Sequence, residues 1–180
     1  MFLLLLTGCS TEEKRLEEYA DKHLSSNFST INTKIIKANK ENFRENLDSF
    51  LQKKKDEKQI LSDLEEYKGK IKYQQKALAQ IKVNGDLNAK HKKEIKQLYS
   101  NYSNLLNGNI EQTEQMEDKI KLGKTITNSD YLIALKKLSR PIVVSNANLI
   151  TFLENNDLTK VKREIRDGNG EHMGMDMDHM

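Results

Sequence analysis

The sequence predicts an all-α protein: an elongated helical bundle built on one long antiparallel α-hairpin of coiled-coil character, with a disordered C-terminal tail. First, only one proline and eight glycines occur in 180 residues, whereas a β-sandwich or barrel needs turn residues every ~8–12 positions. Second, 32% of the residues are charged and 36% are hydrophobic, which suits helices that each bury a single apolar stripe. Third, apolar residues repeat at heptad spacing on both sides of a central turn.

The heptad pattern places the hairpin at residues 57–122. The first arm, 57–83, carries a seam in steps of four and three residues with one polar member. Asn84-Gly85-Asp86 forms the turn, because Asn-Gly is a strong turn dipeptide. The second arm repeats the spacing until residues 107–109, where the stripe resumes in a shifted register, as at a stutter or a kink. The seam residues are Ile60, Leu64, Tyr67, Ile71, Gln74, Leu78 and Ile81, then His91, Ile95, Leu98, Tyr102 and Leu105, then Ile110, Thr113 and Ile120.

Helical spacing extends to both sides of this hairpin. Residues 10–51 carry apolar residues at helical intervals, with a break expected near the polar residues 25–29. Beyond the hairpin, Gly123 ends the second arm, and Thr127-Asn128-Ser129 offers capping residues for the next helix. Pro141 is expected to stop or kink the next helix. The β-branched residues at 142–144 leave a short extended piece open before the chain becomes helical again.

The chain opens with an apolar run that leads into its single cysteine. Leu6-Thr7-Gly8-Cys9 resembles the lipobox of bacterial lipoproteins, and the Lys- and Asn-rich composition resembles that of low-GC Gram-positive bacteria. The resemblance implies that Cys9 carries a lipid anchor such as palmitate on the extracytoplasmic face of the cell membrane. Two or three acyl chains give stable anchoring, whereas one gives only marginal binding. A single cysteine excludes an intramolecular disulfide.

The apolar run itself departs from a complete signal peptide. Residues 2–6 are fewer than the ~7–15 apolar residues of a normal signal core, and no basic region precedes them. We therefore expect the true start of the chain to lie upstream. The alternative interpretation is a buried N-terminal helix turn. The abrupt change to polar residues at 11–18 favours an anchor followed by a tether.

The last ten residues have a composition of their own. Residues 171–180 hold four of the six methionines and two of the four histidines. A thioether prefers cuprous copper, and imidazole binds copper in either oxidation state. Side chains alternate along an extended chain, so Met173, Met175 and Met177 would point to one side. The predicted copper ligands are His172, Met173, Met175, Met177, His179 and Met180.

This segment resembles, in composition, the Met/His-rich segments of bacterial copper-resistance and copper-export proteins. The resemblance implies a ligand class more than a family. The alternatives are a C-terminus under no selection or a scar left by a purification tag. The chain then divides into a signal-peptide remnant (1–8), the lipidated cysteine with a polar tether or first helix (9–26), the helical bundle (27–166) and the tail (167–180).

Other functions find little support in the sequence. The 30 basic and 27 acidic residues nearly balance, and only five of the basic residues are arginines, which argues against nucleic-acid binding. Nucleophile-elbow, phosphate-loop and HExxH motifs are absent from the sequence, so we do not expect an enzyme. His23 and His91 are isolated, and we interpret them as ordinary helix residues.

Two functions remain. The first is a surface lipoprotein that binds copper ion, favouring Cu⁺, and sequesters it or hands it over. Its expected partners are the membrane through the lipid anchor and copper-transport or envelope proteins, and the heptad seam leaves oligomerisation open. The alternative is a helical lipoprotein without a metal, acting as a spacer or protein-interaction module at the cell envelope. The tail discriminates between the two functions.

Overall fold

The computed structural model describes residues 6–83, 86–158 and Val161, and every regular element among them is a helix. The prediction of an all-α fold is therefore confirmed. The predicted disordered tail, 167–180, lies outside the described residues. The elements are α1 (Leu6–Tyr19), the π-helix η1 (Ala20–Ser25), α2 (Ser26–Lys37), the π-helix η2 (Ala38–Arg44), α3 (Glu45–Leu51), α4 (Glu57–Gln80), α5 (Ala89–Leu105), α6 (Asn107–Lys121) and α7 (Asn128–Asn155).

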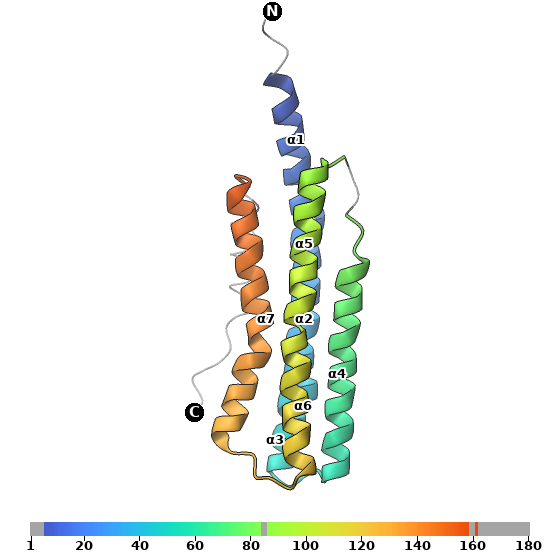
Figure 1. The fold of residues 1–180 in the computed structure, drawn as a ribbon, viewed down its shortest axis with the longest axis vertical. Coiled ribbons are helices and arrows are strands. Elements are labelled where there is room, and N and C mark those ends of the chain that lie inside the picture. Colours follow the sequence, from blue (N-terminus) through green and yellow to red (C-terminus); the bar gives the residue numbers. More distant parts are fainter. Residues whose placement is uncertain (1–5, 84–85, 159–160, 162–180) are drawn as a thin grey trace, which may run out of the picture.

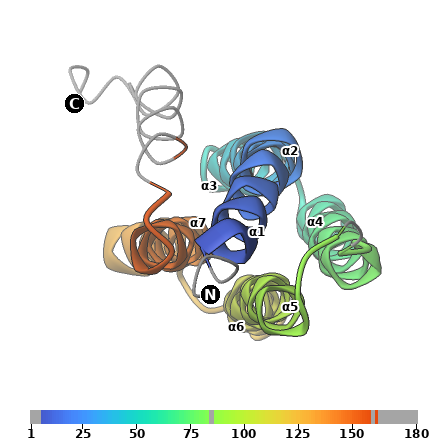
Figure 2. The same ribbon diagram turned by 90° about the horizontal axis from the view of Figure 1, so that it is seen from above.

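These elements form four long rods, because several of them continue one another. The first rod, residues 6–51, joins α1, η1, α2, η2 and α3, whose junctions keep right-handed helical φ and ψ. The second rod is α4, the third joins α5 and α6 through Leu106, and the fourth is α7. The chain runs down, up, down and up along one axis (Figure 1), and the rods surround that axis when seen from above (Figure 2). The fold is an elongated antiparallel four-helix bundle.

The predicted hairpin is formed by α4 with α5 and α6. Lys68 of α4 contacts Glu117 of α6, whereas Gln75, farther along α4, contacts Ser103 and Asn107. Partner numbers fall as residue numbers rise along α4, so the two arms are antiparallel. The described residues between α4 and α5 are not helical, so the chain turns where the Asn-Gly dipeptide predicted. The first arm ends at Gln80, three residues earlier than expected.

The heptad seam forms the centre of the bundle, and its residues pack against other helices of the same chain. In α4 the members from Ile60 to Leu78 are all buried. In the third rod Leu106, rather than Leu105, is fully buried, and a regular spacing of three and four residues continues from it to Ile120. The predicted shift by one residue is therefore present, but it lies at Leu106, where two steps of four residues follow one another from Leu98. Of the members predicted after the shift, Thr113 and Ile120 are buried, whereas Ile110 is only partly buried. The core positions of this stretch are Leu106, Asn109, Thr113, Met116 and Ile120.

The first rod contains two π-helical segments because its apolar spacing is too wide for an α-helix. Leu16, Ala20, Leu24 and Phe28 are all buried and lie four residues apart. Three such steps would rotate the stripe by about 120° in a regular α-helix, at ~100° per residue. The wider turn of η1 takes up this drift, and Ser25 Oγ donates to the carbonyl of Ala20 at 3.0 Å. The break expected near 25–29 is accordingly absent, since the helix widens there instead of ending.

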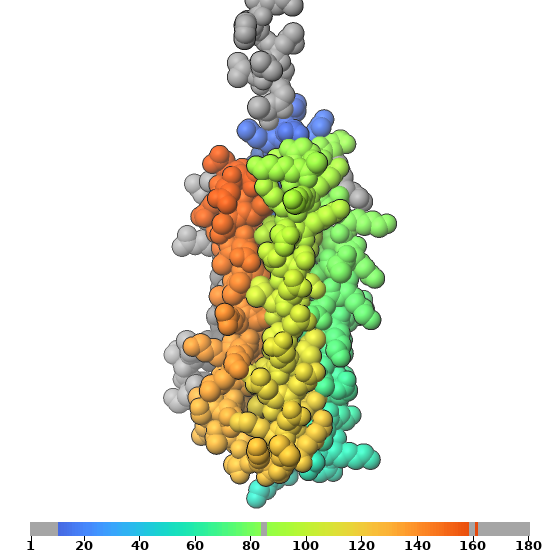
Figure 3. Space-filling view, in the orientation of Figure 1, coloured from blue at the N-terminus to red at the C-terminus, as the bar shows by residue number. Residues whose placement is uncertain are grey.

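The first rod joins the core well before residue 27. Leu16, Tyr19, Ala20 and Leu24 belong to the same buried cluster as the later rods. The expected division between segments 9–26 and 27–166 therefore falls inside a continuous helix. Only the first turns of α1 project beyond the other helices (Figures 1 and 3).

Of the two outcomes expected at Pro141, a stop or a kink, the stop is wrong, because α7 continues through it to Asn155. The residues at 142–144 are helical and not extended. Proline lacks an N–H and disturbs the preceding turn. Buried contacts compensate, since Ala134, Leu138 and Leu149 are each 1% exposed or less. Asn39 Nδ2 also donates to the carbonyl of Leu138 at 3.1 Å, which gives this turn an additional donor.

Capping residues define the starts of α4 and α7, and a glycine defines the end of α6. Asp56 and Gln59 form a capping box at the start of α4, and Thr127 and Asp130 form another at the start of α7. The predicted cap at Thr127 is confirmed. Gly123 follows α6 with a φ of 61°, a conformation that favours glycine, so the predicted end of the second arm is also confirmed.

The same glycine-to-alanine substitution should have opposite effects at two positions. Gly69→Ala inside α4 should stabilise the protein by about 0.5–1 kcal/mol, because alanine has the higher helix propensity. Gly123→Ala should destabilise it by about 1–2 kcal/mol, because its left-handed backbone disfavours a Cβ. An added Cβ meets nothing within 4 Å at either site. The difference in stability between the two variants therefore reports backbone conformation and not a steric clash. Urea unfolding followed by circular dichroism measures both values, and equal signs would contradict the assigned ends of α6.

Candidate functional site

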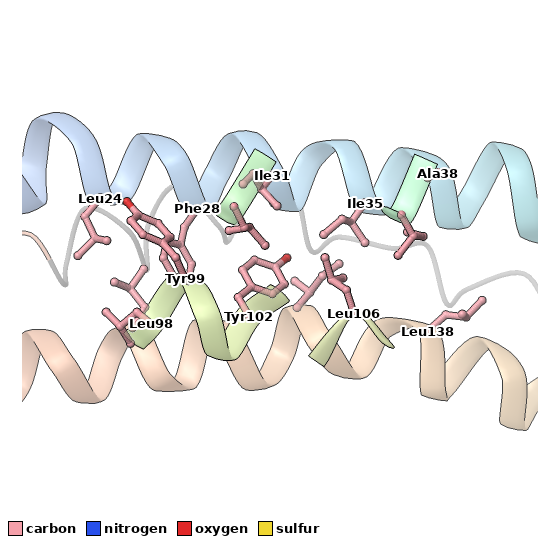
Figure 4. Close-up of a cluster of buried hydrophobic side chains, with 14 of the residues drawn as sticks. Leu24, Phe28, Ile31, Ile35, Ala38, Leu98, Tyr99, Tyr102, Leu106 and Leu138 are labelled. Atoms are coloured by element: carbon pink, nitrogen blue, oxygen red, sulfur yellow. The ribbon is translucent and has the colours of Figure 1, made fainter. Parts of the chain in front are cut away.

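The core contains hydrogen-bonded polar residues at two levels along its axis. At the first level, the Tyr102 hydroxyl donates to Asn32 Oδ1, and Asn32 Nδ2 donates to Asn146 Oδ1 at 2.9 Å. These bonds join the first, third and fourth rods. Phe28 packs against Tyr102 with ring centroids 5.6 Å apart, and Figure 4 shows Tyr99 and Tyr102 of α5 between α5 and α2. Burial raises the pKa of Tyr102 far above its ordinary value, so this phenol remains a donor.

At the second level, one connected set of hydrogen bonds touches all four rods. The Tyr67 hydroxyl donates to Asn39 Oδ1 at 2.7 Å and accepts from Asn109 Nδ2 at 3.0 Å. Asn39 in turn donates to the carbonyl of Leu138. Burial raises the pKa of Tyr67 as well. Asn109, which is 0% exposed, occupies a core position because Tyr67 accepts its hydrogen bond.

A buried ion pair lies between α4 and α6. Lys68 Nζ lies 2.9 Å from Glu117 Oε2 and 2.7 Å from Glu65 Oε2. Burial lowers the pKa of Lys68, but the hydrogen bonds to Glu65 and Glu117 outweigh it and raise the pKa overall. The ammonium therefore stays charged and serves to hold the two helices together. A charged, doubly paired lysine cannot act as a base, and we assign it no chemistry.

The sequence-predicted site residues lie at the two ends of the chain. Cys9 lies in α1, of which the structure gives only the backbone at that position. The predicted copper ligands His172, Met173, Met175, Met177, His179 and Met180 lie outside the described residues. The structure therefore leaves the predicted copper site untested.

The remaining soft donors do not assemble into a metal site within the described ranges. No group of three or more His, Cys, Asp or Glu side chains is found there. Met116 is the one methionine among these residues, and it is 1% exposed in the core. His23 packs against the ring of Tyr19 at 5.2 Å, and the backbone N–H of His91 donates to the capping side chain of Asn88.

A hollow of about 540 Å³ lies at the end of the bundle farthest from the start of α1. We call this the distal end and define it as residues 50–57 and 120–127, which include the α3–α4 and α6–α7 connectors. Four apolar residues and four lysines line the hollow; we call the apolar residues its floor and the lysines its rim. Sequence reasoning missed it. The sequence does place lysines close to a leucine in each of the two connectors. The heptad pattern does not show that these two connectors lie side by side.

The distal connectors contain paired as well as unpaired lysines. Lys55 binds Asp63, and Lys119 binds Asp130. The hydrogen bond from Lys119, together with those from the Thr127 backbone and hydroxyl, lowers the pKa of Asp130 to about 2. This pKa is depressed, so the contact is present above the ordinary value of 3.8 and is lost as the pH falls through about 2.

A second hollow, of about 320 Å³, lies between α5 and α7. It is lined mainly by amide side chains, including Asn101 and Asn148, and its lining contains no lysine or arginine. The basic rim therefore distinguishes the distal hollow from the other one.

Comparison with protein-family models, curated proteins and solved structures finds no match to this chain. Within the residues that the structure describes, none of the helices combines the length and apolar composition needed to cross a bilayer.

Removing one buried hydroxyl should show how strongly the polar core depends on its hydrogen bonds. Tyr102→Phe leaves Asn32 Oδ1 without its donor and should reduce the free energy of unfolding by about 1–3 kcal/mol. Tyr73→Phe is the matched control, because Tyr73 is 64% exposed and should change stability by less than about 0.5 kcal/mol. Chemical denaturation of the two variants measures the difference. Equal stability of both variants would show that the buried bond contributes nothing.

Proposed function

We propose that the protein is an extracytoplasmic lipoprotein whose four-helix bundle forms a rigid spacer on the cell membrane. The observation that carries this proposal is the geometry of α1, which leaves the bundle along its long axis (Figures 1 and 3). The Leu6-Thr7-Gly8-Cys9 sequence lies at the outer end of that helix. A lipid on Cys9 would hold the bundle end-on to the membrane, with the distal end pointing away.

The dimensions suit a spacer. The first rod covers residues 6–51 and is therefore about 70 Å long at ~1.5 Å per residue. Its exposed positions 11–15 precede the first buried residue, Leu16, so a short helical stalk separates Cys9 from the core. The hydrogen-bonded set around Tyr67 touches all four rods, which supports a body that moves as one unit.

Copper binding by the tail is the second candidate function. It concerns a part of the chain that the bundle does not include, because residues 171–180 lie outside the described residues. A tail of thioethers and imidazoles would then be the part of the chain that takes copper, and the bundle would hold it near the membrane. The proposal rests on the composition of residues 171–180.

Lipidation is tested by replacing the cysteine. The full-length gene is expressed in a Gram-positive host, and the protein is followed in membrane and soluble fractions. Wild type should be found with the membrane, and Cys9→Ala should leave it, because the acyl chains are the anchor. Ser10→Ala is the control that should leave fractionation unchanged. Equal membrane association of Cys9→Ala and wild type would refute the anchor.

Copper binding is tested by competition with a cuprous chelator. The full chain should take up about one Cu⁺, while a truncation ending at Asp167 should take up none. A full-length variant with leucine at residues 173, 175, 177 and 180 keeps the length and charge of the tail and should lose most of the affinity. Imidazole must be neutral to bind, so the His172 and His179 contribution should fade below pH ~6.5, while the thioether contribution persists. Equal uptake by the truncation and the full chain would leave the spacer alone as the function.

A further inference from the structure

The distal end gathers apolar side chains that face water. Six large hydrophobic side chains are exposed in the part of the chain that the structure describes. Two of them lie at the distal end, one as the last residue of α3 and one directly after α6, and two lie in the second turn of α7, which starts from the same end. Single exposed hydrophobic residues are normal, but a group of them marks an interaction surface. These four residues are Leu51 (40% exposed), Leu122 (67%), Leu132 (56%) and Ile133 (47%).

The distal hollow shares Leu51 with this exposed apolar set. Phe50 and Leu51 come from the end of α3, Ile120 from the end of α6, and Ile126 from the connector before α7. The volume of about 540 Å³ lies within the ~300–1,000 Å³ of typical binding pockets. One or two large apolar side chains of a partner would fill it.

Three lysines at this end have no carboxylate partner. Lys53, Lys54 and Lys124 line the hollow, and among the described residues none of them forms an ion pair. The nearby Asp56 is occupied as the cap of α4, where it accepts from the backbone N–H of Gln59 at 2.8 Å. Asp56 and Glu57 are the two acidic side chains that line the hollow, against the four lysines Lys53, Lys54, Lys55 and Lys124. The rim is therefore positively charged.

Backbone hydrogen bonds fix the conformation of both connectors that carry these lysines. The backbone N–H of Lys53 donates to the carbonyl of Phe50 at 2.9 Å, and that of Lys54 donates to Ser49 at 2.8 Å. On the other connector, the backbone N–H of Lys124 donates to the carbonyl of Lys119 at 2.9 Å. A surface that keeps its backbone conformation loses less entropy when it binds.

We propose that the distal end is a docking surface for an acidic, amphipathic segment of another protein. Apolar side chains of that segment occupy the hollow, and its carboxylates face Lys53, Lys54 and Lys124. A bare polyanion would pair with the lysines but would leave Leu51 and the floor in water. A neutral apolar segment would fill the floor but leave three charges unpaired. The proposal needs neither the lipid anchor nor copper, because every residue it uses belongs to the bundle.

Fluorescence anisotropy with a labelled synthetic peptide tests the surface. The probe is an amphipathic helix of about 18 residues with leucines at i, i+3, i+4 and i+7 and glutamates elsewhere on its length. The comparison probes are the same peptide with glutamine for glutamate, and inorganic polyphosphate. The full chain should bind the acidic peptide at least about tenfold more tightly than either comparison probe. Binding should weaken as salt rises, because surface charges are screened.

Variants locate the site. Changing Lys53, Lys54 and Lys124 together to glutamine should weaken peptide binding at least about tenfold. Changing Lys76, Lys93 and Lys96 together removes the same charge from exposed positions on α4 and α5 and should have little effect. Leu51→Ser tests the floor and should weaken binding as well. Circular dichroism checks that each variant is folded, and amide NMR shifts should concentrate at residues 50–57 and 120–127.

Four results would overturn the proposal. Equal binding of the glutamine peptide would exclude a role for charge, and equal binding of polyphosphate would show a simple polyanion site. Equal losses in the two lysine triples would show that net charge alone attracts the peptide. Binding that appears only after truncation at Asp167 would show that the tail of this chain is the occupant, and not a partner.

Discussion

The whole bundle depends on each rod keeping one apolar stripe turned toward a common axis over its full length. A chain with 36% hydrophobic residues can bury only a narrow stripe, so a drift in register removes core residues that nothing replaces. α4 meets the constraint with a regular heptad. The first rod meets it with two π-helical segments, and α7 does so across a proline. These irregularities preserve the register and do not interrupt it.

Apolar contacts alone would leave the rods free to slide by a heptad, and the buried polar residues oppose this. Tyr67 can bond to both Asn39 and Asn109 only when three rods are at one relative height. Tyr102, Asn32 and Asn146 impose a second condition at another height. A displaced rod would leave buried donors and acceptors unpaired, at about 1–3 kcal/mol each. The amides and phenols therefore specify which of several similar packings is adopted, as a single buried asparagine does in coiled coils.

Periodicity alone predicted the helical class, the turn near Asn84-Gly85 and the buried face of α4, because these depend on local spacing. Periodicity did not identify Asn109 as a core residue. A polar residue is assigned to the surface unless its hydrogen-bond partner, here Tyr67, is known to lie opposite. The stop expected at Pro141 is absent because tertiary contacts outweigh the local preference of one residue. Periodicity also could not predict the distal hollow. Its lining residues belong to two connectors about 70 residues apart, and only the arrangement of the four rods brings these connectors together. The assignments of the copper ligands and of Cys9 as a lipidation site depend on the sequence alone.

The wide turn at η2 has a consequence for changes in chain length. In a regular helix, losing one residue rotates everything beyond it by about 100° and turns the apolar stripe away from its partners. Between the buried residues Ala38 and Phe43 the first rod takes a step of five, where an α-helical stripe takes three or four. Loss of one residue from 40–42 would leave a step of four, which an ordinary α-helix accommodates with both halves of the rod still facing the core. A deletion inside a long core helix is normally poorly tolerated. Within residues 40–42 it should preserve the buried stripe on both sides, because η2 contains one residue more than an α-helical stripe requires.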